Sequence, residues 1–156
     1  NSDRAEDFTV SNQGTVHDFY KAGLVTASLN LHYKNNEAYE LEYSPFGANS
    51  GLCVGVPSTA GNGTKVSLQA CGVSSETVWV TATGPASPSQ LITKGYVALI
   101  NGSDTNFSHP FALNYPNSSW PTDMPRPQLQ TWEIQDFSSN AIYDNGLFGA
   151  HPGILP

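Results

Sequence analysis

The titratable side chains of this sequence do not form a recognised catalytic motif. It contains no Gly-x-Ser-x-Gly nucleophile elbow, no phosphate-binding glycine loop and no His-Glu-x-x-His zinc motif. The histidines stand singly and are expected at the surface or in turns; they are His17, His32, His109 and His151. Carboxylates such as Glu40, Glu42, Asp123 and Asp136 could act as paired glycosidase acids only at separations of about 5–9 Å. We therefore predict a protein that binds rather than catalyses, with no cofactor or metal.

A polar and aromatic group around residues 114–123 has the chemistry of a ligand site. Asn114 and Tyr115 end a predicted strand, and the loop that follows carries Trp120 and Asp123. A fixed acceptor, a flat apolar ring and an amide that both donates and accepts are what sugar recognition needs. Trp120 lies in a polar, proline-rich loop, where it could stack on a sugar or a partner, or fold back and cap the core.

The two cysteines and the asparagine sequons bear on the compartment. Cys53 and Cys71 have no histidine or cysteine cluster near them, which favours a disulfide over a metal site. The bond would close a loop of about 18 residues, stabilise the fold by roughly 3 kcal/mol and favour an oxidising compartment. Asn-x-Ser/Thr sequons, candidate glycosylation sites, fall in predicted loops at Asn62, Asn101, Asn106 and Asn117.

Composition narrows the class of protein. A chain of 156 residues is expected to form one domain. Its net charge is −7 and its basic residues are scattered, which argues against nucleic acid and anionic membrane surfaces. Only 12% of residues are charged, so the polar surface must come from Asn, Ser, Thr, Gln and Gly. This composition suits a secreted β protein and neutral ligands such as glycans. A start at Asn1 fits a mature secreted chain or a trimmed one, and no transmembrane helix is predicted.

Short apolar runs separated by turn residues must position these groups, and they predict an all-β domain. The predicted strands are 24–28, 29–33, 39–43, 52–56, 66–70, 78–82, 91–92, 96–100, 111–115, 129–134 and 147–148. Residues 1–7 are expected to form a loose arm, and long helices are not expected. The proline-rich stretch 116–127 predicts one long loop.

Two stretches of the chain repeat one order of residues. Residues 39–79, the first unit, and residues 96–148, the second unit, share an initial tyrosine, a leucine shortly after it and a later Leu-Gln pair. A repeat of this size points to a fold built from similar units. The first unit runs Gly51-Leu-Cys-Val-Gly-Val-Pro57, a Gly/Asn turn, Lys65-Val-Ser-Leu-Gln-Ala-Cys71 and then Val78-Trp79.

The first unit resembles one repeat of the ricin B-type β-trefoil lectins. Their repeat has a Cys-Leu-Asp strand, a Gly/Asn-rich turn, a Val-x-Leu-x-x-Cys strand and a Gln-x-Trp closure. The resemblance implies a β-trefoil, with another small β-barrel or a β-sandwich as the alternative. It also implies a Cys53–Cys71 disulfide and a core position for Trp79. A trefoil needs three units, and residues 1–38 carry no recognisable motif for the third.

The second unit matches this pattern less closely and departs from it informatively. Ala112 is expected to correspond to Cys53, Trp132 to Cys71 and Phe148 to the closing Trp79. The family's sugar-binding aspartate falls at Gly55 in the first unit and at Asn114 in the second. The resemblance therefore implies a sugar site in the second unit only.

Three functions remain open from the sequence. The first is a secreted, lectin-like module that binds glycans at Asn114, Tyr115, Trp120 and Asp123. The second is a protein-binding trefoil, such as a protease inhibitor that presents loop 116–127. The third is a structural or envelope-associated secreted protein. None involves nucleic acid or insertion into a membrane.

Overall fold

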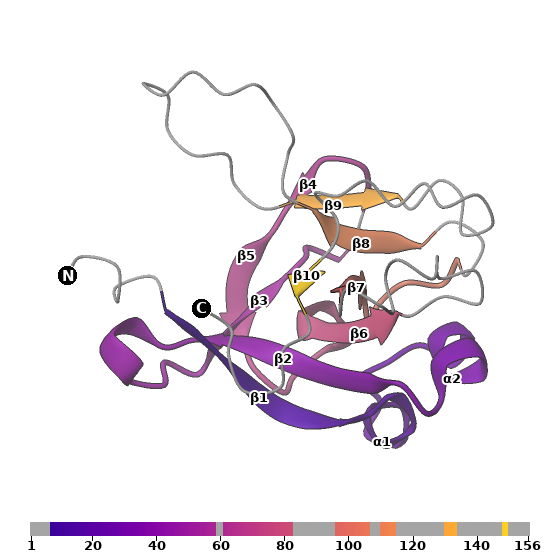
Figure 1. Ribbon diagram of the computed structural model, residues 1–156, viewed down its shortest axis with the longest axis horizontal. Coiled ribbons are helices and arrows are strands. Elements are labelled where there is room, and N and C mark those ends of the chain that lie inside the picture. The colour runs from indigo at the N-terminus through magenta and orange to yellow at the C-terminus, as the bar shows by residue number, and fades with distance from the viewer. Residues whose placement is uncertain are drawn as a thin grey trace.

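The computed structural model describes residues 7–58, 61–82, 96–106, 110–114, 130–133 and 148–149, and these form a largely antiparallel all-β structure (Figure 1). Its strands are β1 (Phe8–Thr15), β2 (Glu37–Tyr43), β3 (Leu52–Gly55), β4 (Thr64–Lys65), β5 (Ser67–Ala70), β6 (Val78–Ala82), β7 (Tyr96–Asn101), β8 (Phe111–Asn114), β9 (Gln130–Glu133) and β10 (Phe148–Gly149). The helices are α1 (Val16–Lys21) and α2 (Ala27–Tyr33), with 3-10 turns at Pro45–Gly47 and Ser75–Thr77. The prediction of an all-β class is confirmed.

The predicted strands from 39 onward overlap observed strands, except 91–92, which lies outside the described residues. The two predicted strands 24–28 and 29–33 are wrong, because most of this stretch forms α2. Thr26 caps the helix by accepting a hydrogen bond from the backbone of Leu29. Leu29 and Tyr33, four residues apart, then lie on one buried face. The β-branched residues of this stretch, Val25 and Thr26, precede α2 and therefore do not oppose the helix.

Strand β1 was not predicted and extends the sheet at its N-terminal end. It pairs with β2 from Phe8 opposite Tyr43 to Thr15 opposite Glu37, with a bulge between Ser11 and Gly14. The carbonyl of Asp7 accepts a hydrogen bond of 2.8 Å from the Ser44 amide, so this end of the predicted loose arm is tied to the sheet. The rest of the predicted arm lies outside the described residues.

The strand order makes the sheet curl back toward its starting point. It runs β4-β9-β8-β7-β6-β2-β3-β5, with β1 added on β2 and β10 on β7. The ends of this path, β4 and β5, are separated in the chain by Val66 alone. One continuous stretch therefore pairs with β9 through β4 and with β3 through β5.

The two repeated units have the same pattern of strand pairing. In the first, β2 pairs with β3 and β6, and β3 pairs with β5. In the second, β7 pairs with β8 and β10, and β8 pairs with β9. The strand before each unit also pairs with its first strand, as β1 does with β2 and β6 with β7. The repeat seen in the sequence is thus a repeat of topology.

The register of these pairs aligns the units residue by residue. Glu42 lies opposite Cys53 as Ile100 lies opposite Ala112, so Ala112 corresponds to Cys53 as expected. Trp132 lies opposite Ala112 as Gln69 lies opposite Cys53, so Trp132 corresponds to Gln69 and not to Cys71. The predicted alignment was wrong there by two positions.

The same register brings three aromatic residues into equivalent positions. Trp79 lies opposite Tyr39 of its own unit, as Phe148 lies opposite Val97. Trp79 also lies opposite Asn101 at the end of β7, as Phe8 lies opposite Tyr43 at the end of β2. Phe8, Trp79 and Phe148 therefore occupy the same register position in β1, β6 and β10, which we call the closing strands. Strand β1 is the counterpart of β6 and β10.

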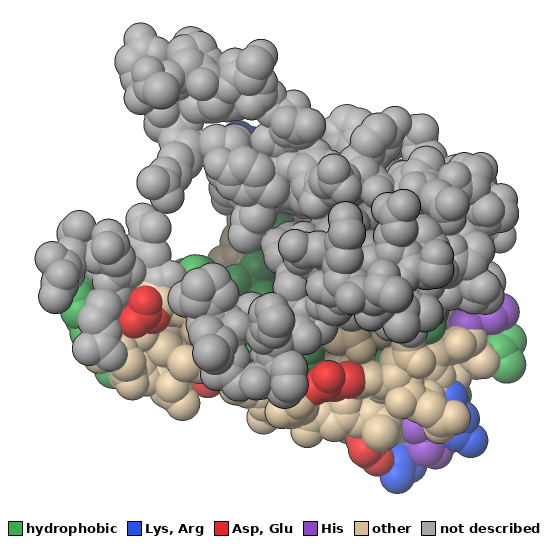
Figure 2. Space-filling model, in the orientation of Figure 1, with side chains coloured by type: hydrophobic (Ala, Val, Ile, Leu, Met, Phe, Trp, Pro, Cys, Tyr) green, Lys and Arg blue, Asp and Glu red, His purple; other side chains and the backbone are tan. Residues whose placement is uncertain are grey.

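Two apolar clusters lie on opposite faces of the sheet. The first joins α1 and α2 to β2, β6, β7 and β8, through residues such as Phe19, Leu29, Val80 and Ile100. The second gathers Val54, Val56, Val66, Trp79, Leu99 and Leu113 between the hairpins. Lys and His side chains collect over the two helices at the lower right of Figure 2. None of the helices formed by described residues has the length and apolar character needed to cross a membrane.

Candidate functional site

The residues predicted to bind sugar are only partly within the described structure. Asn114 is the last residue of β8 and pairs with Gln130 of β9. Tyr115, Trp120 and Asp123, together with loop 116–127, lie outside the described residues. The register makes Asn114 the counterpart of Gly55, as the sequence alignment expected.

The equivalent position in the first unit is closed to a side chain. A Cβ placed at Gly55 would lie 3.0 Å from the Glu76 carbonyl oxygen and 3.0 Å from Cγ2 of Thr77. The amide nitrogen of Gln69 would be only 3.2 Å away, and it already donates to the Val56 carbonyl at 2.7 Å. A side chain at position 55 would require the Glu76 backbone and the Thr77 and Gln69 side chains to shift by a few tenths of an ångström, so the first unit leaves little room for a carboxylate there.

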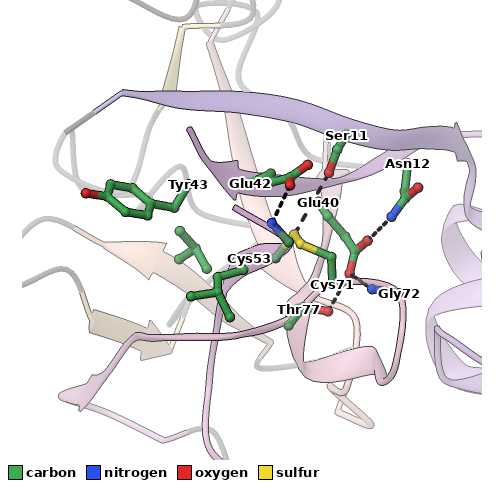
Figure 3. Close-up of a disulfide and its surroundings, with 12 residues drawn as sticks. Ser11, Asn12, Glu40, Glu42, Tyr43, Cys53, Cys71, Gly72 and Thr77 are labelled. Carbon is green, nitrogen blue, oxygen red and sulfur yellow. Dashed lines mark hydrogen bonds between the residues drawn. A yellow bond between two sulfur atoms is a disulfide. The ribbon is translucent and has the colours of Figure 1, made fainter. Parts of the chain in front are cut away.

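A buried carboxylate organises the other side of the first unit. Glu40 is 0% exposed and accepts hydrogen bonds from the Gly72 amide at 2.8 Å and the Thr77 hydroxyl at 2.5 Å. The side-chain amide of Asn12 donates to its second oxygen, from the bulge of β1 (Figure 3). Asn12 has φ 46°, a left-handed conformation that asparagine tolerates better than most residues. Three donors from separate segments thus offset the cost of burying this group.

The disulfide joins strand β3 to turn 71–74 beside this carboxylate. Cys53 and Cys71 are bonded, which confirms the predicted disulfide. The Cys71 amide also donates to the Gly51 carbonyl at 3.0 Å, and the Gly51 amide donates to Glu42 at 2.7 Å (Figure 3). Turn 44–51, between β2 and β3, is therefore fastened to turn 71–74, which follows β5.

Turn 44–51 displays an aromatic side chain in an unfavourable backbone conformation. Its tip is a β-turn in which the Gly47 amide donates to the Ser44 carbonyl at 2.9 Å, with Pro45 and Phe46 in the central positions. Phe46 has φ 55° and ψ 25°, where glycine is usual. For a bulky residue this conformation costs about 1–2 kcal/mol. The ring is nevertheless 68% exposed, so packing of the ring does not repay the strain.

Hydrogen bonds of the buried Ser44 and the exposed Ser50 hold the two ends of the turn. Ser44 is 0% exposed, and its hydroxyl lies 2.7 Å from that of Thr9 and 3.3 Å from the amide oxygen of Asn49. The hydroxyl of Ser50 donates to the Tyr43 carbonyl at 2.6 Å and accepts from the Leu52 amide at 3.2 Å. These bonds fix the path of the chain on both sides of Phe46.

These carboxylates act as structural groups. Glu40 is enclosed and Glu42 is 7% exposed, so neither is placed to meet a substrate from solvent. The sequence raised them as glycosidase acids, and the geometry of these two does not favour that role. Among the described residues, no group of three or more His, Cys, Asp or Glu side chains could hold a metal ion.

A second buried carboxylate supports the β7–β8 connection. Asp104 accepts from the backbone amides of Asn106 at 2.7 Å and Phe111 at 2.5 Å. Burial raises the pKa of Asp104, and these two hydrogen bonds partly oppose the shift. Burial, and then the charge of Asp104, also raise the pKa of Tyr33. The Thr26 hydroxyl donates to the Asp104 carbonyl at 2.5 Å, which links this connection to the start of α2.

The sequons differ in accessibility. Asn62 and Asn106 are exposed and lie outside strands, as predicted, and Asn117 lies outside the described residues. The prediction of a loop was wrong for Asn101, which ends β7, is 0% exposed and donates to the Glu76 carbonyl at 2.9 Å. Because the side chain is fully buried, a glycan on that amide nitrogen would require the surrounding structure to open.

The sequence reasoning did not find the two features that shape this region. The burial of Glu40 depends on hydrogen-bond donors from residues 12, 72 and 77. No local sequence pattern predicts that these three residues come together. For Phe46 the sequence held one usable signal, the Ser-Pro-x-Gly order of a β-turn, which places the third residue at a corner.

Comparison with protein-family models finds no match, and comparisons with curated proteins and with solved structures find no significant one.

Proposed function

We propose that this protein is a secreted, non-catalytic, carbohydrate-binding module of the β-trefoil type. The proposed site lies in the second unit and comprises Asn114, Tyr115, Trp120 and Asp123. The observation that carries the proposal is the equivalence of Gly55 and Asn114 in two units of identical pairing. One unit has a glycine here, crowded by the Glu76 carbonyl and the Thr77 and Gln69 side chains, and the other has an asparagine.

The β-trefoil assignment is supported by the strand pairing. Each unit has a first and a last strand that pair with one another and a hairpin that branches from the first strand. Phe8, Trp79 and Phe148 supply one aromatic residue to each of three closing strands. Strand β1 would then be the closing strand of a third unit, although residues 1–38 show no sequence motif for it.

The disulfide supports a secreted location. The Cys53–Cys71 disulfide is typical of proteins from oxidising compartments. Partners would be neutral glycans, because the net charge of −7 disfavours nucleic acid and anionic surfaces.

A glycan array followed by calorimetry on any hits tests the proposal. The chain is prepared with its disulfide intact, beside Asn114→Ala, Trp120→Ala and the control Asn62→Ala, which alters an exposed asparagine of the first unit. We expect binding to at least one glycan class, with affinity lowered about tenfold or more by the first two substitutions and unchanged in the control. Absence of binding at high micromolar protein would overturn the function. Unchanged binding in Asn114→Ala and Trp120→Ala would overturn the site.

A further inference from the structure

We propose a second ligand surface on the first unit, formed by turns 44–51 and 71–74, with Phe46 as its central contact and neutral polysaccharide as its ligand. We call this surface the uncharged turn pair. It rests on the proposed glycan-binding function but uses residues of the first unit, which are separate from the site proposed in the second unit.

Exposure is the first line of support. Phe46 is 68% exposed and Val73 is 72% exposed, each at the tip of one of the two turns. The Cys71–Gly51 hydrogen bond and the disulfide hold these turns together. Turn 44–51 projects beyond β2 and β3 at the left of Figure 1. Each of these two connected turns therefore carries one exposed apolar side chain.

Rigidity is the second line of support. The left-handed conformation of Phe46 is maintained by bonds to its neighbours rather than by contacts of its own ring. A bulky residue kept in such a conformation at the surface is the kind of backbone outlier that accompanies ligand contacts. A ring held in one position also loses little conformational freedom when a ligand stacks on it.

Charge decides the class of ligand. Residues 44–51 and 71–74 include no Asp, Glu, Lys, Arg or His. The described basic side chains of the helices lie at another part of the molecule, over α1 and α2 (Figure 2). Glu40 and Glu42, whose carboxylates accept hydrogen bonds from the turns, are buried, whereas Asp7, whose carbonyl accepts from the Ser44 amide at 2.8 Å, and Glu76 are only partly buried. The turns themselves carry no cation that could pair with phosphate or sulfate, so the ligand that their own side chains favour is a neutral one.

The remaining groups fit a sugar ring. The Phe46 ring supplies an apolar platform. Asn49 is exposed, and its amide oxygen accepts a hydrogen bond from the Ser44 hydroxyl at 3.3 Å. An apolar face beside a fixed amide is the combination that a pyranose, with its apolar ring face and equatorial hydroxyls, requires.

The test measures depletion of the purified protein by insoluble neutral polysaccharides, namely cellulose, chitin, xylan and mannan. The variants are Phe46→Ala, Phe46→Trp, Asn49→Ala and Trp120→Ala. The matched control is Leu31→Ala, which removes an equally exposed hydrophobic residue, 77% exposed, from α2. Circular dichroism melts confirm that each variant is folded.

We expect wild type and Leu31→Ala to bind one polymer alike. Phe46→Ala should weaken that binding at least tenfold, Asn49→Ala about threefold, and Phe46→Trp should restore it. Equal binding by Phe46→Ala and Leu31→Ala overturns the inference, as does wild type that binds none of the polymers. Loss in Trp120→Ala alone overturns the inference but supports the proposed site in the second unit. Loss in Phe46→Ala alone supports the inference and counts against that site.

Discussion

Phe8 and Trp79 hold equivalent positions in two closing strands but have different surroundings. Trp79 is 0% exposed, and its indole nitrogen donates to the Val54 carbonyl at 2.9 Å. Phe8 is 39% exposed and meets Tyr43, with ring centroids 5.6 Å apart. Both residues pair with the first strand of the following unit. Strand pairing alone therefore does not decide how deeply a closing aromatic is buried.

The difference lies in the hairpin that belongs to each closing strand. Trp79 packs with Val54, Val56 and Val66, which come from the β3–β5 hairpin of its own unit. Phe8 instead packs against Tyr43 of β2, at the edge of the described structure. The deep burial of Trp79 is thus provided by the hairpin of its own unit.

Substitution of Trp79 and Phe8 by alanine should give the largest difference in stability. Trp79→Ala should lower the free energy of unfolding by about 3–5 kcal/mol, because it leaves a large cavity and an unpaired carbonyl at Val54. Phe8→Ala should cost about 1 kcal/mol, because the partly exposed ring leaves no closed cavity. Urea denaturation monitored by far-UV circular dichroism measures both values. Equal costs would show that position in the strand, not the hairpin, sets the contribution.

Removing the disulfide should loosen the hairpin that covers Trp79, which tests how far that hairpin stabilises the buried indole. The double substitution Cys53→Ala and Cys71→Ala should lower the free energy of unfolding by about 3 kcal/mol. Part of that loss should overlap with the loss in Trp79→Phe, because the two changes act on the same cluster. Phe8→Ala, combined with the double substitution, serves as the control and should be additive. A fully additive effect with Trp79→Phe would mean that the disulfide does not help to bury the indole.

The sequence predicted those parts of the fold that depend on local patterns. The disulfide, the core position of Trp79 and the Gly55–Asn114 equivalence all follow from short runs around Cys53 and Asn114. Strand β1 escaped prediction because Ser11-Asn12-Gln13-Gly14 reads as a turn, whereas the bulge accommodates those residues within a strand. Helix α2 was mistaken for strands because a single side chain, the Thr26 cap, decides its start.

The candidate site was less predictable because its parts come together through tertiary contacts. Glutamate is rarely buried, so nothing in the sequence marked Glu40 as an interior residue. Its donors lie 28 residues before it, at Asn12, and 32 and 37 residues after it, at Gly72 and Thr77. The turn that carries Phe46 is likewise held in part by bonds from Ser44 to Asp7 and Thr9, more than 30 residues earlier in the chain, which no local preference encodes.

Alkaline titration tests the burial of Tyr39, the strand partner of Trp79. Tyr39 lies opposite Trp79, and burial, followed by the charge of Glu37, raises its pKa from 10.0 to about 12. The folded state therefore retains the phenol proton longer than the unfolded state. Its contribution to stability is complete below pH 10 and is lost as the pH rises from 10 to about 12.

Tyr39→Phe is the variant that isolates this contribution. Wild type should lose stability over that range at a rate that exceeds the variant's by at most about 1.4 kcal/mol per pH unit. Thermal melts from pH 9 to 12 measure the difference between the two slopes. Identical slopes would show that the Tyr39 hydroxyl is as well solvated in the folded state as in the unfolded state, so that burial near Trp79 does not reach it.

The smallest effect concerns Phe46, an exposed aromatic residue in a strained backbone conformation. At φ 55° a side chain of any kind is strained, so Phe46→Gly should be more stable than Phe46→Ala by about 1 kcal/mol. The order should reverse at Leu31, in α2, where Leu31→Gly should be less stable than Leu31→Ala by about 1 kcal/mol. Urea denaturation of the four variants gives both differences with one method. If glycine is also the less stable residue at position 46, the turn relaxes when the ring is removed, and the strain belongs to the phenylalanine rather than to the backbone path that Ser44 and Ser50 impose.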